Sequence, residues 1–226
     1  MKCFGFKFKS IKYNKNYKRN INKNNKKVLY KFIYQTIITT HNNIVVFIDE
    51  SSICQSNFQN KIWTLKKNSD RNIISKIKYE RIMIVAGISF ECVENLMILE
   101  SNFNKKIFNY FILNILSKVY KQTNYLKQII IVMDNASTHK NSQLIKICQK
   151  LKVGIVFTIP GQPKANAIEY YWQYIKQDFK QMITYIGNFI RRSELFDILQ
   201  KRFIQTSNKD LIKYIKRTLK FIKSKI

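Results

Sequence analysis

The chain lacks the residues from which several common kinds of site are built. Its four cysteines are scattered without a CxxC pair, and its two histidines lie far apart. This spacing indicates neither a zinc cluster nor a disulfide framework, and it fits a reducing intracellular compartment. No uninterrupted apolar run approaches the roughly 20 residues that span a bilayer. Lysines also interrupt any signal-peptide core at the N-terminus. We therefore expect no association with a membrane.

Negative charge is also scarce. Only 13 Asp and Glu stand against 41 Lys and Arg, which gives a formal net charge of +28 at pH 7. Such a chain is attracted to polyanions, because neutralising phosphates releases condensed counterions and strengthens binding at low salt. Nucleic acid is therefore the leading expected partner, and we expect the protein in the nucleus if its host has one.

What is present is enough apolar sequence, 46% of 226 residues, to bury one sizeable core. Runs rich in β-branched residues predict strands, and apolar residues at helical spacing predict amphipathic helices. The expected strands are 44–51, 78–90, 93–100, 127–135 and 153–160, and the expected helices are 104–122, 141–151, 166–183, 192–203 and 209–226. This order indicates an α/β domain with a mixed sheet.

Two of the expected strands end in an acid after nearly identical apolar runs, "IVVFID" at Asp49 and "IIIVMD" at Asp134. Active sites of α/β sheets collect at the carboxyl ends of parallel strands, and neighbouring strand tips lie roughly 5 Å apart. Two carboxylates that close repel each other unless a cation lies between them. The alternative is that each acid is an ordinary turn or helix-capping residue.

A third acid, Glu169, stands just inside the helix expected after Pro160 and Pro163. With Asn166 as the N-cap, Glu169 falls at the position of a capping box. Alternatively, Glu169 lies at the edge of the apolar face and points toward the two aspartates. Three carboxylates around one or two Mg²⁺ ions are suited to phosphodiester chemistry.

At this point the sequence resembles the DDE transposases of the Tc1/mariner and IS630 superfamily. The blocks that carry the resemblance are "FIDESSICQ", Trp63 in "NKIWTLKK", "IMIVAGIS", "IIVMDNASTHK" and "IPGQPKANAIEYYWQYIK". They occur in the family's order over roughly residues 44–183. In addition, 34 residues separate Asp134 from Glu169, as in the DD34E members.

The resemblance implies a ribonuclease H-like fold, a mixed sheet flanked by helices with extra C-terminal helices. It implies that Asp49, Asp134 and Glu169 are catalytic and hold Mg²⁺ as two ions, with Mn²⁺ as a substitute. The implied activity is cleavage of DNA at transposon ends and strand transfer into target DNA, carried out by a homodimer in the DNA complex.

Other residues have supporting roles by the same resemblance. Asn135 and His139 would support the site, and a hydrogen-bonded structural histidine is equally consistent with the sequence. Trp63 and Trp172 either stack on unpaired bases or anchor the core. The basic residues expected to contact DNA are Lys164, Lys176, Lys213 and Arg217. For the C-terminal helix, a solvated basic face and membrane-surface or calmodulin-type binding are alternatives.

The chain departs from the family in two ways. Its turn before Glu169 has fewer prolines, and only about 40 residues precede the first strand, where the family has helix-turn-helix domains. Two other functions therefore stay open, a domesticated, inactive DNA-binding protein and a ribonuclease H-like nuclease. The expected parts are a flexible Lys/Asn-rich arm over 1–40, a catalytic domain over 41–185 and packed basic helices over 186–226.

Overall fold

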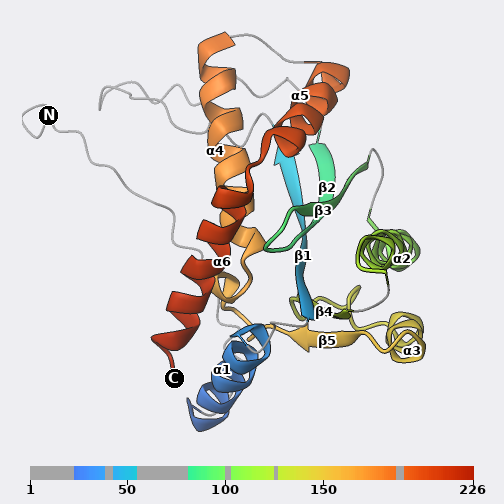
Figure 1. Cartoon of the computed structure of the whole chain (residues 1–226). Helices are drawn as coiled ribbons and strands as arrows, with labels where there is room; N and C mark the ends of the chain where they lie inside the picture. Colours follow the sequence, from blue (N-terminus) through green and yellow to red (C-terminus); the bar gives the residue numbers. More distant parts are fainter. Residues whose placement is uncertain (1–22, 39–42, 55–80, 100–102, 125–126, 187–190) are drawn as a thin grey trace, which may run out of the picture.

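A mixed five-stranded sheet forms the centre of the protein (Figure 1). The computed structural model describes residues 23–38, 43–54, 81–99, 103–124, 127–186 and 191–226. The strands are β1 Asn43–Cys54, β2 Arg81–Ile88, β3 Val93–Leu99, β4 Gln128–Met133 and β5 Gly154–Phe157. Their order in the sheet is β3-β2-β1-β4-β5. The expected strands and the mixed sheet are confirmed.

The middle strand, β1, joins two kinds of pairing. It runs antiparallel to β2, which in turn pairs antiparallel with β3, and it runs parallel to β4, which pairs parallel with β5. In the parallel pair, Phe47 is aligned with Val132. The two strands that end in aspartate are therefore neighbours with the same direction.

Helices cover both faces of this sheet. They are α1 Lys23–Ile38, α2 Lys105–Gln122, α3 Ser142–Lys150, the short 3-10 helix η4 Pro163–Ala165, α4 Ile168–Ile186, α5 Arg192–Gln205 and α6 Asn208–Lys223. Figure 1 shows α2 and α3 on one side of the sheet and α4, α5 and α6 on the other. Within the described ranges, no helix is long and apolar enough to cross a membrane.

Strand β1 supplies both cores because successive side chains of a strand point to opposite faces. Val46 and Ile48 pack in the core beneath α2 and α3. Val45 and Phe47 pack in the core beneath α1, α4, α5 and α6. All four side chains are buried. The continuous apolar run thus predicts correctly that this strand is covered on both sides.

Helix α1 differs from the flexible arm expected over residues 1–40. Tyr30, Ile33 and Ile37 share one helical face, are buried and belong to the same core as α6. The Tyr30 ring meets Phe221 of α6 edge-on, with 6.2 Å between centroids. The abundant Lys and Asn concealed this short apolar face in the sequence. Residues 1–22 lie outside the described residues.

Candidate active site

The sheet register places the two aspartates side by side. Phe47 of β1 is aligned with Val132 of β4, so Asp49 and Asp134 each lie two residues further along parallel neighbours. Adjacent strands are about 4.8 Å apart. Asp49 is still within β1, whereas Asp134 directly follows the last residue of β4. The neighbourhood expected from the sequence is present.

Glu169 lies near these aspartates at the first turn of α4. Burial, together with the negative charges of Glu169, Glu50 and Asp134, raises the pKa of Asp49 to about 8. Burial and Asp134 also raise the pKa of Glu169, while Lys176 opposes this rise. The charges of Asp134 and Glu169 thus act on Asp49, and the charge of Asp134 acts on Glu169. A cation between these acids would relieve that repulsion.

His139 contacts two acids of the site, Asp134 and Glu50. Its ring is fully buried and stacks on Phe108, with 4.4 Å between centroids. Nδ1 lies 2.7 Å from Asp134 Oδ1, and Nε2 lies 2.8 Å from Glu50 Oε1. Burial alone would lower the pKa of His139, but these two carboxylates raise it to about 10. The ring is thus an imidazolium that donates from both nitrogens at neutral pH.

The same contact keeps Asp134 ionised. The hydrogen bond from His139 is the largest cause that lowers the pKa of Asp134, and the Ala136 backbone N–H adds a second hydrogen bond of 2.9 Å. Burial acts in the opposite direction without reversing the shift. Asp49 and Asp134 therefore differ in protonation, since Asp49 holds a proton at neutral pH when no cation is bound.

Asn166 has a different role from the N-cap expected in the sequence. Its Nδ2 donates to the Ile48 carbonyl of β1 at 3.1 Å, and its side chain is buried. The Glu169 N–H instead donates to the Asn166 backbone carbonyl at 3.2 Å. Of the two alternatives for this position, the capping box is therefore wrong. Asn166 fastens the start of α4 to β1 one residue before Asp49.

Asn135 supports the neighbouring loop. Its Nδ2 donates to the Thr158 carbonyl, and the Thr158 N–H donates to the Met133 carbonyl at 2.8 Å. These bonds tie the segment after β5 to the end of β4. They fix one wall of the site beside Asp134.

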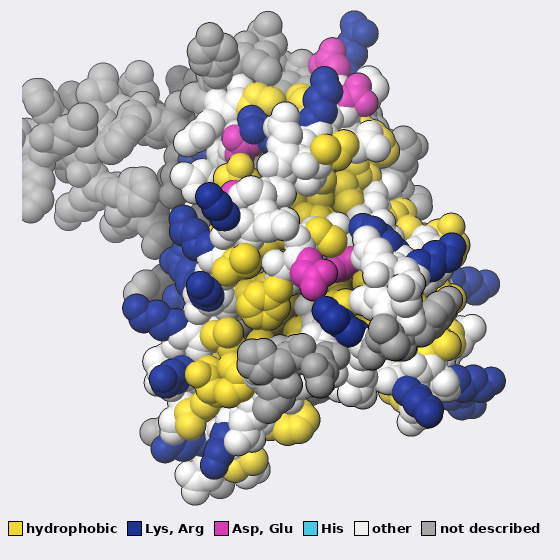
Figure 2. Space-filling view, in the orientation of Figure 1, with side chains coloured by type: hydrophobic (Ala, Val, Ile, Leu, Met, Phe, Trp, Pro, Cys, Tyr) yellow, Lys and Arg dark blue, Asp and Glu magenta, His cyan; other side chains and the backbone are white. Residues whose placement is uncertain are grey.

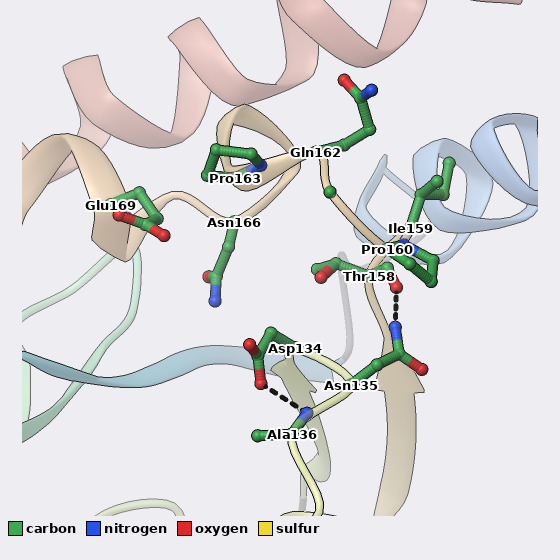
Figure 3. A pocket seen from close by; sticks show the side chains of 11 residues that line it. Asp134, Asn135, Ala136, Thr158, Ile159, Pro160, Gln162, Pro163, Asn166 and Glu169 are labelled. Carbon is green, nitrogen blue, oxygen red and sulfur yellow. Dashed lines mark hydrogen bonds between the residues drawn. The ribbon is translucent and has the colours of Figure 1, made fainter. Parts of the chain in front are cut away.

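A pocket of about 380 Å³ opens at this end of the sheet (Figure 3). Its lining residues are Asp134, Asn135, Ala136, Thr158, Ile159, Pro160, Gly161, Gln162, Pro163, Asn166 and Glu169. In Figure 3, Asp134 enters from the sheet side, while Asn166 and Glu169 enter from the α4 side. The Asn166 Oδ1 is buried and has no hydrogen-bond partner among the described residues.

The donor chemistry of this site fits a divalent metal such as Mg²⁺. Its side chains offer hard carboxylate oxygens, and a cation beside Asp49 would relieve the repulsion that raises the pKa of this group. Among the described residues, no three His, Cys, Asp or Glu side chains are gathered closely enough to form a metal cluster. Asp134 is instead drawn to His139 and Ala136.

Of the two tryptophans expected near the site, the structure describes Trp172. Trp172 is 2% exposed and packs beside Tyr171 and Phe203 of the core. A side chain so buried has no free face for a base, so the core interpretation is correct and base stacking is wrong. Trp63 lies outside the described residues.

The basic residues expected to contact DNA lie on η4, α4 and α6. Lys164 is exposed on η4 and Lys213 is exposed on α6, while Lys176 is partly buried on α4. The Arg217 guanidinium of α6 lies over the Tyr170 ring of α4, 4.6 Å from its centroid. Their contact with DNA stays a prediction.

The family model described as "DDE superfamily endonuclease" matches residues 44–189, which is more than half of the chain. The chain belongs to the DDE superfamily endonucleases. No curated protein matches this DDE endonuclease.

Solved structures show the same fold for this DDE endonuclease. The Mos1 transposase paired-end complex with left transposon end has a TM-score of 0.71 and 12% identity, covering 99% of this chain and 67% of that chain. The catalytic domain of Mos1 mariner transposase has a TM-score of 0.66 and 11% identity, covering 92% and 94%. The Mos1 mariner paired end complex with Mn has a TM-score of 0.68 and 13% identity, covering 96% and 66%.

The ribonuclease H-like fold and the resemblance to mariner-type transposases are thus confirmed. This DDE endonuclease spans about two thirds of the Mos1 chains solved with transposon ends. The positions of Glu50 and Asn166 are what sequence reasoning missed. The available signal for Glu50 was its place directly after Asp49. The block that follows the neighbouring strand contains one histidine, His139, with which a second acid could pair.

Proposed function

We propose that this chain is the catalytic domain of a transposase, which cleaves DNA strands and joins a 3′-hydroxyl to target DNA in a metal-dependent reaction. The observation that carries the proposal is geometric: Asp49 and Asp134 lie on neighbouring parallel strands, and Asp134 and Glu169 line the same pocket. Family membership and the Mos1 fold support it. Mos1 structures have been solved with transposon ends, Mn and Mg.

Asp49, Asp134 and Glu169 would hold Mg²⁺, or Mn²⁺ in its place, as two ions. When bound, such ions supply a Lewis acid that activates an attacking oxygen and stabilises the leaving oxygen of an in-line displacement. The pocket beside Asp134 and Glu169 gives the scissile phosphate a place to lie within reach of these acids.

The surrounding side chains prepare the acids for this task. His139 holds Asp134 ionised and fixes its orientation through a 2.7 Å contact, while Glu50 steadies the opposite ring nitrogen. Asn166 holds the α4 turn against β1 and so sets the position of Glu169 relative to Asp49. Preorganised charge of this kind lowers the reorganisation needed during phosphoryl transfer.

The partners and the compartment follow from the same proposal. The substrates would be transposon ends and target DNA, held by the strongly positive chain. The acting form would be a homodimer in the DNA complex, located in the nucleus. A sedimentation measurement of the protein with end DNA would report the number of copies in the complex.

The experiment that tests the proposal incubates the protein with labelled duplex DNA and Mg²⁺ or Mn²⁺. We expect metal-dependent nicking and strand-transfer products, which Asp134→Ala removes and Asp197→Ala, an exposed acid of α5, retains. Activity unchanged in Asp134→Ala would refute the proposal. Binding without any cleavage would indicate a domesticated DNA-binding protein, and selective cleavage of RNA·DNA hybrids would indicate a ribonuclease H-like nuclease.

A further inference from the structure

Helix α6 carries a straight row of lysines on its outer face. They are Lys209, Lys213, Lys216, Lys220 and Lys223, and all five are exposed. Their spacings alternate between four and three residues. At about 100° per residue, five side chains so spaced fall within an arc of roughly 80° and extend over roughly 21 Å. We call this row the α6 basic face.

The opposite side of α6 is committed to the core. Leu211, Ile215, Thr218 and Ile222 are buried there. The apolar side of this amphipathic helix is therefore covered by the protein itself, whereas a helix that binds a membrane inserts its apolar side into lipid. What α6 presents to solvent is charge.

An acid beside the row does not neutralise it. The carboxylate of Asp210 accepts a hydrogen bond of 2.7 Å from the Ser207 hydroxyl at the start of α6. Asp210 also lies about 100° around the helix from Lys209. The five lysines thus form a surface of one sign.

Helix α6, which carries the basic face, lies next to the pocket of the candidate active site. Helix α6 packs against η4, whose first residue, Pro163, lines that pocket. Arg217 lies over Tyr170, next to Glu169 in the first turn of α4. In Figure 2, Lys and Arg side chains gather over α6 and continue over α1, while acidic side chains lie near the middle of the same face. A polyanion held on α6 would therefore lie on the face of the protein that also carries acidic side chains.

We propose that the α6 basic face binds the phosphate backbone of duplex DNA and holds the duplex beside the pocket. This inference rests on the proposed function, which makes DNA the substrate. A row of roughly 21 Å matches about six base pairs, because a duplex rises about 3.4 Å per pair. Lysines contact phosphates as point charges, so the face positions DNA without reading its sequence.

The test measures the affinity of the full chain for duplex DNA at several salt concentrations, in Ca²⁺ to prevent cleavage. The variant Lys213→Gln/Lys216→Gln/Lys220→Gln removes three charges from the α6 basic face. The matched control is Lys106→Gln/Lys121→Gln/Lys146→Gln. It removes three exposed lysines from α2 and α3, on the other side of the sheet.

We expect the α6 triple variant to lose affinity about tenfold or more, and its salt slope to fall by about 2.7, since each phosphate contact contributes about 0.9. The control should lose much less. Equal losses in both variants would show a general charge effect and overturn the proposal, as would wild-type affinity in the α6 variant. Tighter binding of the wild type to anionic vesicles than to duplex DNA would also overturn it.

Failure of this inference is distinguishable from failure of the proposed function. If DNA binding depends on the α6 basic face but no variant cleaves DNA, the binding surface stands and the catalytic proposal fails. If the wild type cleaves DNA and the α6 triple variant binds and cleaves it equally well, the catalytic proposal stands and the binding surface is wrong. Thermal unfolding of both triple variants verifies that each is folded.

Discussion

Metal binding at this site should release a proton from Asp49. Burial, Glu169, Glu50 and Asp134 raise the pKa of Asp49 to about 8 in the metal-free protein. A carboxyl with that pKa is about 90% protonated at pH 7 and about 10% protonated at pH 9. Because a metal binds the carboxylate form, we expect release of roughly one proton from Asp49 at pH 7 and little release at pH 9.

Calorimetric titration with Mn²⁺ measures this release directly. The apparent binding enthalpy should change with the ionisation enthalpy of the buffer, and the slope of that dependence is the number of protons released. The apparent affinity should also fall about tenfold for each pH unit below 8. Asp197→Asn, a change at an exposed acid of α5, should leave the proton count unaltered.

The raised pKa of Asp49 also determines the direction in which pH changes the stability of the fold. The folded-state pKa of Asp49 lies above its ordinary value of 3.8, so the folded protein binds more protons than the unfolded chain between about pH 4 and 8. The contribution of Asp49 to stability therefore decreases as pH rises through this window, and bound metal should restore it. Mn²⁺ binding at pH 7 without buffer-dependent heat would refute the reasoning.

Three further substitutions test other contacts. His139→Gln removes the cation between Glu50 and half-exposed Asp134, so we expect the free energy of unfolding to fall by about 2 kcal/mol. Urea denaturation measures this change, and an unchanged midpoint would contradict the pairing. Asn166→Ala leaves the Ile48 carbonyl without its partner, so we expect a loss of about 1–3 kcal/mol and weaker Mn²⁺ binding by calorimetry, unlike exposed Asn208→Ala. Ile33→Ala should cost about 2–5 kcal/mol if α1 belongs to the core, and a cost near zero would mean that α1 folds apart from it.

Apolar patterns in the sequence predict the central sheet well. The runs before Asp49 and Asp134 are continuous because β1 and β4 are covered on both faces, and a buried parallel strand leaves this signal in the sequence. The shared pattern also predicts correctly that the two acids are neighbours. Local sequence sufficed here because a strand that is covered on both faces is recognisable from its own continuous apolar run.

The remaining contacts depend on residues that are distant in sequence. Asn166 has the spacing of an N-cap before Glu169, yet it donates to Ile48, which is 118 residues away. Glu50 and His139 are 89 residues apart. Neither pairing has a periodic signature, because each follows from how α4 and the segment after β4 pack on β1. The core face of α1 was missed for a related reason, since its partner is α6 at the other end of the chain.

The central claim, that Asp49, Asp134 and Glu169 hold a common metal, is tested most directly by a crystal structure of the protein with Mn²⁺. We predict anomalous density at about 2.2 Å from carboxylate oxygens of Asp49 and Asp134, with Glu169 as a further ligand or one water away. Anomalous density that avoids these three residues, or its absence at saturating Mn²⁺, would contradict the claim.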